Sequence, residues 1–195
     1  MARLGGFRPT ITEALAVRVP SLLNAPGRFN ENVPLRNRPP VINDVAGALP
    51  IQELLDRMEW ASQAANPVAY ARHLRAVPLR GVPPKAVIFQ IAKGDQTVPN
   101  PTSTAILRAG RLADRATFFR NDLAFAADPT VPKNPHGFLT RLNVPSVVPA
   151  AVGAQRQIAT FLASDGTVVI DPDGPGPLFE IPIVPPLPED LSFIP

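Results

Sequence analysis

Asp95 and His136 are the two residues of this sequence whose types and spacing best suit acid–base chemistry. Asp95 lies in the stretch GDQTVP, directly after an apolar run, and His136 lies 41 residues later in the stretch NPHGFL. A histidine can accept a proton from a serine hydroxyl near neutral pH, and a carboxylate beside it fixes the tautomer of the ring and stabilises the imidazolium. An acid followed by a histidine after one more helix and strand matches the end of the chain order Ser, Asp, His.

Each of the two residues could also have a purely structural role. Gly94-Asp95 is also ordinary turn chemistry after a strand, and His136 could simply stabilise a loop. The acid–base interpretation depends on context, because in open α/β sheets the functional loops follow the carboxyl ends of the strands. Both residues have that context, so we expect Asp95 to be the acid and His136 the general base, and the two assignments stand or fall together.

The residues around this pair resemble the C-terminal part of an α/β-hydrolase. The resemblance is carried by Gly94, Asp95, Val98 and Pro99 in GDQTVP and by the stretch HGF that begins at His136. It covers roughly residues 50–165, and the helical stretch before the acid is similar to that of large bacterial esterases and lipases. The resemblance implies a serine hydrolase acting on an ester or lipid substrate, without a metal or cofactor. It also implies a secreted or cell-envelope location, although no signal peptide is evident in the sequence.

The nucleophile of such an enzyme is missing from this sequence. The family carries a G-x-S-x-G turn upstream of the acid. None of the six serines in this sequence has a glycine both two residues before it and two residues after it. The six are Ser21, Ser62, Ser103, Ser146, Ser164 and Ser192. We therefore expect the chain to be the C-terminal portion of a longer serine hydrolase and to be inactive alone. The alternative is an inactive hydrolase remnant that serves as an interaction module or pairs with a second chain.

The elements that would position the pair follow from the apolar patterning. Residues 86–89 form a continuous apolar run that Ile91 extends, which is typical of a strand buried on both faces in a parallel sheet. We expect strands over 85–92 and 116–122, helices over 50–66, 67–76, 101–116 (ending early, near Gly110) and 149–166, and a loop over 123–138. Strands that alternate with helices indicate the α/β class, here the last strands and helices of an α/β-hydrolase sheet.

Proline sets the expected organisation of the chain. The sequence has 26 prolines in 195 residues, well above the usual share of about 5%. We expect an irregular segment with one short helix over residues 1–49, the hydrolase-like domain over 50–170 and a proline-rich tail over 171–195.

Composition and motifs exclude several classes of partner and site. The net charge of +3 comes from scattered basic residues, and no zinc-finger or RNA-binding pattern is present, so we expect no nucleic-acid partner. No stretch approaches the roughly 18 apolar residues of a membrane span. The absence of cysteine excludes disulfides and thiol catalysis.

Two other candidate sites have ordinary explanations. The stretch around Asp171, Asp173 and Gly174 lacks the further ligands of a calcium loop. We expect His73 to be an ordinary surface histidine of a helix. The remaining partners expected are the substrate and the missing N-terminal half.

Overall fold

The computed structural model describes residues 48–195, which fall into two units divided between Asn66 and Pro67. The described part of the first unit is helix α3 (Ala48–Ser62), followed by the short 3-10 helix η4 (Gln63–Ala65). This confirms the helix predicted over 50–66. The short helix and irregular segment predicted over residues 1–49 lie outside the described residues, apart from residues 48 and 49, which begin α3.

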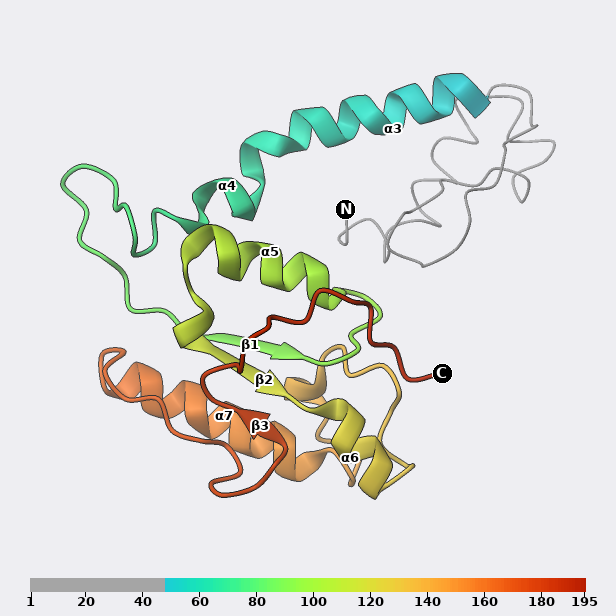
Figure 1. Cartoon of the computed structure of the whole chain (residues 1–195), viewed down its shortest axis with the longest axis vertical. Coiled ribbons are helices and arrows are strands. Elements are labelled where there is room, and N and C mark those ends of the chain that lie inside the picture. Colours follow the sequence, from blue (N-terminus) through green and yellow to red (C-terminus); the bar gives the residue numbers. More distant parts are fainter. Residues whose placement is uncertain (1–47) are drawn as a thin grey trace. The chain divides into compact units, whose positions relative to one another are not determined.

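The second unit is built on a small mixed sheet of three strands (Figure 1). Strand β1 (Phe89–Ala92) pairs in parallel with β2 (Ala116–Phe119), and β2 pairs antiparallel with β3 (Phe179–Glu180). The parallel pairing of the two predicted strands is confirmed, and all four residues of the central strand β2 are buried. A sheet with a parallel pair joined by a helix belongs to the α/β class.

Two helices cover opposite faces of this sheet, as Figure 1 shows. Helix α5 (Asn100–Gly110) packs Leu107 against Ala116 and Phe118 of β2. On the other face, helix α7 (Val148–Ala163) packs its alanines into a cluster with Ala92 and Phe119. Both helices were predicted, and α5 does end at Gly110. Alternate strand residues feed the two clusters, as the pleat of a strand requires.

Both predicted strands are shorter than expected. Strand β1 begins at Phe89 rather than at residue 85, where its pairing with Ala116 starts, and β2 ends at Phe119 rather than at residue 122, because residues 121 and 122 belong to a helix.

Three further parts of the second unit differ from the predictions. Helix α4 (Pro67–Ala71) stops five residues early, because the chain continues in turns closed by bonds from the backbone N–H of His73 to Tyr70 and of Leu74 to Ala71. Helix α6 (Asn121–Ala127) occupies the start of the predicted loop over 123–138, and its seven residues are too few to show a helical period. Strand β3 was not expected at all, since only two residues of the proline-rich tail pair with β2.

Short elements and contacts complete this unit. The 3-10 helices are η5 (Ala113–Arg115), before β2, and η6 (Phe138–Thr140), before α7. The tail returns along α5, where the Thr104 hydroxyl donates to the carbonyl of Pro188 at 3.3 Å and Arg108 pairs with Glu189. None of the helices within residues 48–195 combines the length and apolar character needed to cross a membrane.

Candidate functional site

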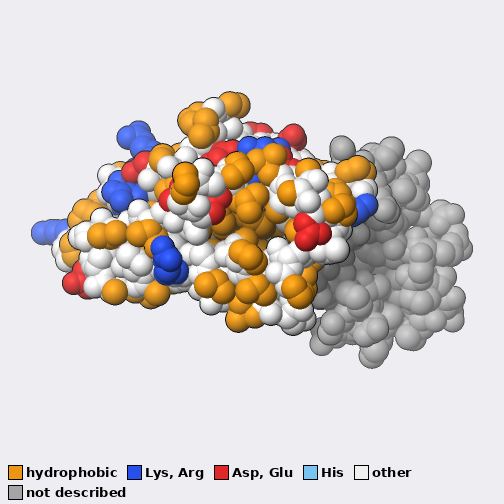
Figure 2. All heavy atoms as spheres, turned by 90° about the horizontal axis from the view of Figure 1, so that it is seen from below, with side chains coloured by type: hydrophobic (Ala, Val, Ile, Leu, Met, Phe, Trp, Pro, Cys, Tyr) orange, Lys and Arg blue, Asp and Glu red, His pale blue; other side chains and the backbone are white. Residues whose placement is uncertain are grey.

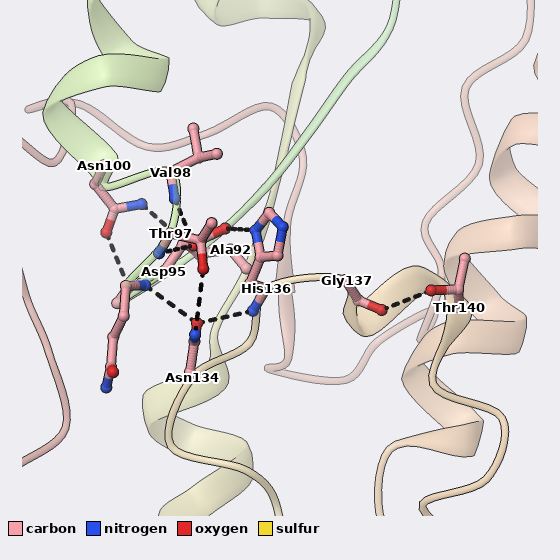
Figure 3. A network of polar contacts seen from close by, with 11 residues as sticks. Ala92, Asp95, Thr97, Val98, Asn100, Asn134, His136, Gly137 and Thr140 are labelled. Carbon is pink, nitrogen blue, oxygen red and sulfur yellow. Dashed lines mark hydrogen bonds and ion pairs between the residues drawn. The ribbon is translucent and has the colours of Figure 1, made fainter. Parts of the chain in front are cut away.

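The acid–base pair predicted from the sequence comes together in the structure (Figure 3). Nδ1 of His136 lies 3.1 Å from Oδ2 of Asp95. The aspartate side chain is only 14% exposed, whereas that of the histidine is 46% exposed. A carboxylate only accepts hydrogen bonds, so this contact requires the ring proton to be on Nδ1. The opposite ring nitrogen, Nε2, has no hydrogen-bond partner, because His136 makes no side-chain hydrogen bond other than that to Asp95 with any residue from 48 to 195. In the neutral ring with its proton on Nδ1, Nε2 carries the lone pair that can accept a proton.

The turn that carries Asp95 is fixed by the residues on either side of it. The parallel pairing continues one residue past β1, where the backbone N–H of Lys93 donates to the carbonyl of Phe119 at 2.9 Å. Gly94 then turns the chain with φ at +79°, and a Cβ there would lie 2.6 Å from the backbone oxygen of Ser192. Glycine is thus required at position 94 both by its conformation and by the space available.

Asn100 holds this turn from the start of helix α5. Its side chain is almost fully buried; it donates to the carbonyl of Ala92 at 2.8 Å and accepts from the backbone N–H of Gly94 at 2.9 Å. Asn100 does not cap the helix, although asparagine is a common capping residue: Pro99 occupies the cap position, and no side chain caps the helix. The amide side chain instead satisfies buried backbone groups at the end of β1, which would otherwise be costly to leave unpaired.

Backbone donors set the orientation of the Asp95 carboxylate. Its Oδ1 accepts from the N–H of Thr97 at 2.7 Å and from that of Val98 at 2.8 Å. Aspartate commonly forms such turns with the backbone two residues ahead. With Oδ1 occupied in this way, Oδ2 is the atom left to face His136. The turn interpretation and the acid interpretation of Asp95 are therefore compatible, since the turn aims the acid.

The loop that carries His136 is anchored by packing on both sides of the histidine. Pro135 is fully buried, and the ring of Phe138 stacks on Phe119 of β2 with centroids 4.7 Å apart. Further back, the buried Asn121 at the start of α6 donates to the carbonyls of Pro132 and Lys133 at 3.1 and 3.4 Å. The exposed histidine thus sits on a well-supported loop.

A second polar cluster lies beyond the same strands. Arg120 makes two hydrogen bonds to the Asp122 carboxylate, at 2.8 and 2.9 Å, and one to Glu180 at 2.8 Å, while Lys93 contacts Asp122 at 3.0 Å. Burial raises the pKa of Asp122, but hydrogen bonds from Arg120 and Lys93 outweigh burial and leave the pKa at about 2. The bond to Asp122 likewise raises the pKa of Arg120, although burial opposes it. The two shifts favour the charged forms of Asp122 and Arg120.

The remaining candidates are not brought to the pair. No serine hydroxyl within residues 48–195 hydrogen-bonds to His136, and Ser21 lies outside the described residues. Nδ1 of His73 contacts the carbonyl of Val77 at 2.7 Å instead. Asp171 accepts a bond from the backbone of Asp173, and burial together with its contact to Asp173 raises the pKa of Asp171. The described residues contain no group of three or more potential metal-ligating side chains.

Charged side chains do not gather on the face of the molecule shown in Figure 2. Among the described residues visible there, Lys and Arg are scattered between acidic and apolar side chains. Comparison with known proteins finds no matching family model, no matching curated protein and no matching solved structure. The assignment of chemistry to this site therefore rests on its own geometry and on the residues that carry the resemblance.

Proposed function

We propose that this chain supplies the acid and the base of a serine-hydrolase triad. Asp95 is the acid, His136 is the general base, and the serine lies on a polypeptide segment outside this sequence. The observation that carries the proposal is the 3.1 Å contact between Nδ1 and Oδ2, which leaves Nε2 unoccupied. The loop does not need an exposed histidine for its own stability, because the buried neighbours Pro135 and Phe138 already anchor the loop.

The proposed reaction is the hydrolysis of a carboxylic ester, including lipid esters. The serine hydroxyl attacks the ester carbonyl while Nε2 of His136 takes the hydroxyl proton. The same nitrogen then returns the proton to the leaving alcohol, and water clears the acyl-enzyme by the reverse sequence of proton transfers. Asp95 holds the proton on Nδ1 throughout and stabilises the imidazolium through its charge. The steps use no metal or cofactor.

In this proposal the missing segment pairs with the free edge of β1. Within residues 48–195, β1 pairs with β2 on one side only. Because Lys93 bonds towards β2, the alternation along the strand directs the backbone groups of Gln90 to the free edge. The carbonyl of Ala92 faces the same way but already accepts from Asn100, so an added strand would pair at Gln90. A parallel strand added there would end beside Asp95, because the carboxyl ends of parallel strands meet at one edge of a sheet.

A specific observation favours the second candidate, in which this edge pairs with another chain. The side-chain Nε2 of Gln90 donates to Ala154 and Gln157 at 2.9 and 2.8 Å, but its Oε1 is buried without a partner. Buried oxygens are usually satisfied, so β1 carries an incompletely bonded amide as well as an unpaired edge. A partner that carries no serine would make the assembly an interaction module rather than an enzyme.

The test begins with the reading frame upstream of residue 1. The polypeptide it encodes is co-expressed with this chain, and the purified assembly is assayed with p-nitrophenyl acetate and butyrate. We expect hydrolysis, and we expect His136→Ala and Asp95→Asn each to lower kcat by about a thousandfold or more, as in other triads. His73→Ala is the matched control, because it removes the other histidine of the sequence.

Two outcomes would overturn the proposal. One is an assembly that hydrolyses esters equally well with and without His136. The other is an upstream segment that has no serine in a strand–turn–helix setting and adds no ester hydrolysis. In that second case, stable co-purification of the two chains would establish the interaction module instead.

A further inference from the structure

Asn134 connects the loop of the acid to the loop of the base. Its Oδ1 accepts two backbone hydrogen bonds, from the N–H of Gln96 at 3.1 Å and from the N–H of His136 at 3.1 Å. Its Nδ2 reaches the hydroxyl of Thr97 at 3.4 Å. Figure 3 shows this amide directly between the two segments, beneath the contact of the carboxylate with the imidazole.

The two bonds to Oδ1 act on the residues that matter most to the pair. Gln96 immediately follows the acid, and His136 is the base itself. One oxygen atom therefore fixes the distance between two backbone segments that are 40 residues apart in sequence, from position 96 to position 136. The contact between His136 and Asp95 is the next link between the same loops, so the two links should depend on one another.

The rest of the loop does not need Asn134 for its support. Pro135 is buried, Phe138 stacks on Phe119, and Asn121 holds the carbonyls of Pro132 and Lys133. These contacts fix where the loop lies on the sheet. None of them joins the backbone of His136 to the turn of Asp95.

We propose that Asn134 is a positioning residue of the acid–base pair, which sets the backbone of His136 at the distance where Nδ1 meets Asp95. The inference rests on the proposed function, because positioning matters only if the pair works as acid and base. Asn134 makes no hydrogen bond to the side chain of His136 or of Asp95, so it acts through the backbone N–H groups of Gln96 and His136. It therefore sets geometry without taking or giving a proton.

The experiment measures the tautomer of His136 directly in the isolated chain. Ring-nitrogen chemical shifts are recorded by NMR in alkaline buffer, where histidine rings are neutral and the Nδ1–H and Nε2–H forms can be told apart. In the wild type, we expect the Nδ1–H form to dominate and its ring proton to exchange slowly with water. In Asn134→Ala, we expect the ratio of Nδ1–H to Nε2–H to fall about threefold or more, as the loss of one net hydrogen bond implies.

Three further variants make the result specific. Asn134→Asp keeps an oxygen that can accept both backbone bonds, and should restore most of the wild-type ratio. Asn143→Ala removes an exposed asparagine of the same region and should change nothing. Asn134→Leu fills the space without an acceptor, and replaces the alanine variant if that one unfolds. If neither the alanine nor the leucine variant unfolds cooperatively, Asn134 serves the whole fold and the positioning inference is overturned.

Asp95→Asn separates this inference from the proposed function. The asparagine amide would donate to Nδ1 and drive the proton to Nε2. If Asp95→Asn shifts the tautomer and Asn134→Ala does not, the positioning inference fails while the acid–base pair stands. If Asp95→Asn leaves the tautomer as in the wild type, the pair itself fails.

Discussion

Two polar clusters follow the same pair of parallel strands, and they differ in whether each functional atom has a partner. In the cluster of Lys93, Arg120, Asp122 and Glu180, opposite charges meet at 2.8–3.0 Å. In the pair of Asp95 and His136, the acid is fully engaged, but Nε2 of the histidine is not bonded by any described residue. The first arrangement is closed and suits a role in stability. The second is open at one atom and suits a role in chemistry.

This difference predicts that the closed cluster contributes mainly to the stability of the fold and the open pair mainly to chemistry. Charges removed from the closed cluster should cost folding free energy without affecting the tautomer of His136. Changes to the open pair should alter the tautomer at little cost in stability. The four predictions that follow run from the largest expected change in unfolding free energy to the smallest.

Arg120→Ala should destabilise the fold by about 3 kcal/mol, because it leaves two partly buried carboxylates, Asp122 and Glu180, without their shared cation. Urea unfolding followed by circular dichroism measures this loss. Arg156→Ala, which removes an exposed arginine of α7, is the control and should stay within about 0.5 kcal/mol of the wild type. If Arg120→Ala lowers the free energy of unfolding as little as the control does, the cluster does not stabilise the fold.

Gly94→Ala should destabilise the second unit by about 2 kcal/mol. The positive φ of +79° is strained for alanine, and the new Cβ would meet the backbone oxygen of Ser192 at 2.6 Å. Gly81→Ala is the matched control, since Gly81 also has a positive φ, of +78°, but no atom within 4 Å of the added Cβ. The difference between the two variants in thermal unfolding isolates the contact with the tail, and equal losses would contradict that contact.

The contribution of Asp122 should depend on pH in a defined window. Its pKa falls from 3.8 to about 2 on folding, so its ionised form stabilises the fold. The contribution is complete above the unfolded value of 3.8 and is lost as the pH falls through about 2. It should amount to about 1 kcal/mol, because solvent screens a partly exposed pair.

The measurement is the difference in unfolding free energy between the wild type and Asp122→Asn across acidic pH. That difference should shrink as the pH is lowered from about 4 to about 2. A difference that stays constant over this range would mean that the ionisation of Asp122 is not linked to folding.

His136→Ala should change stability by less than about 0.5 kcal/mol, because the ring is half exposed and makes one hydrogen bond. Thermal unfolding of the isolated chain measures this. A loss of more than about 1.5 kcal/mol would place His136 among the structural residues and remove the contrast between the two clusters.

The parts of the fold that the sequence predicted are those in which a pattern repeats. Helix α7 shows apolar residues at helical spacing over four turns, and β1 and β2 lie in stretches where apolar residues predominate. Helix α6 and strand β3 are too short to repeat any pattern, and both form because tertiary partners fix them. Asp122 in the first turn of α6 meets Arg120 and Lys93, and Phe179 of β3 packs against Phe119.

The residues of the candidate site likewise fall into those that the sequence predicts and those that it does not. Asp95 and His136 could be predicted because each follows a strand, and parallel strands deliver their loops to one edge. The three asparagines that fix the surrounding backbone, Asn100, Asn121 and Asn134, leave no periodic signal. Each is defined by which carbonyl or N–H it reaches across the fold, and that follows only from the tertiary arrangement. The only hint for Asn134 is its place two residues before His136, where asparagine often bonds to the backbone.

The late position of β3 in the chain has a consequence for synthesis on the ribosome. Strand β2, which follows β1, emerges about 60 residues before Phe179 and Glu180, which close the far edge of β2. During that interval, the most buried strand of the finished molecule has an unpaired edge, and such edges invite association with other chains. Nascent chains stalled between α7 and β3 should therefore be the form of this protein most dependent on chaperones.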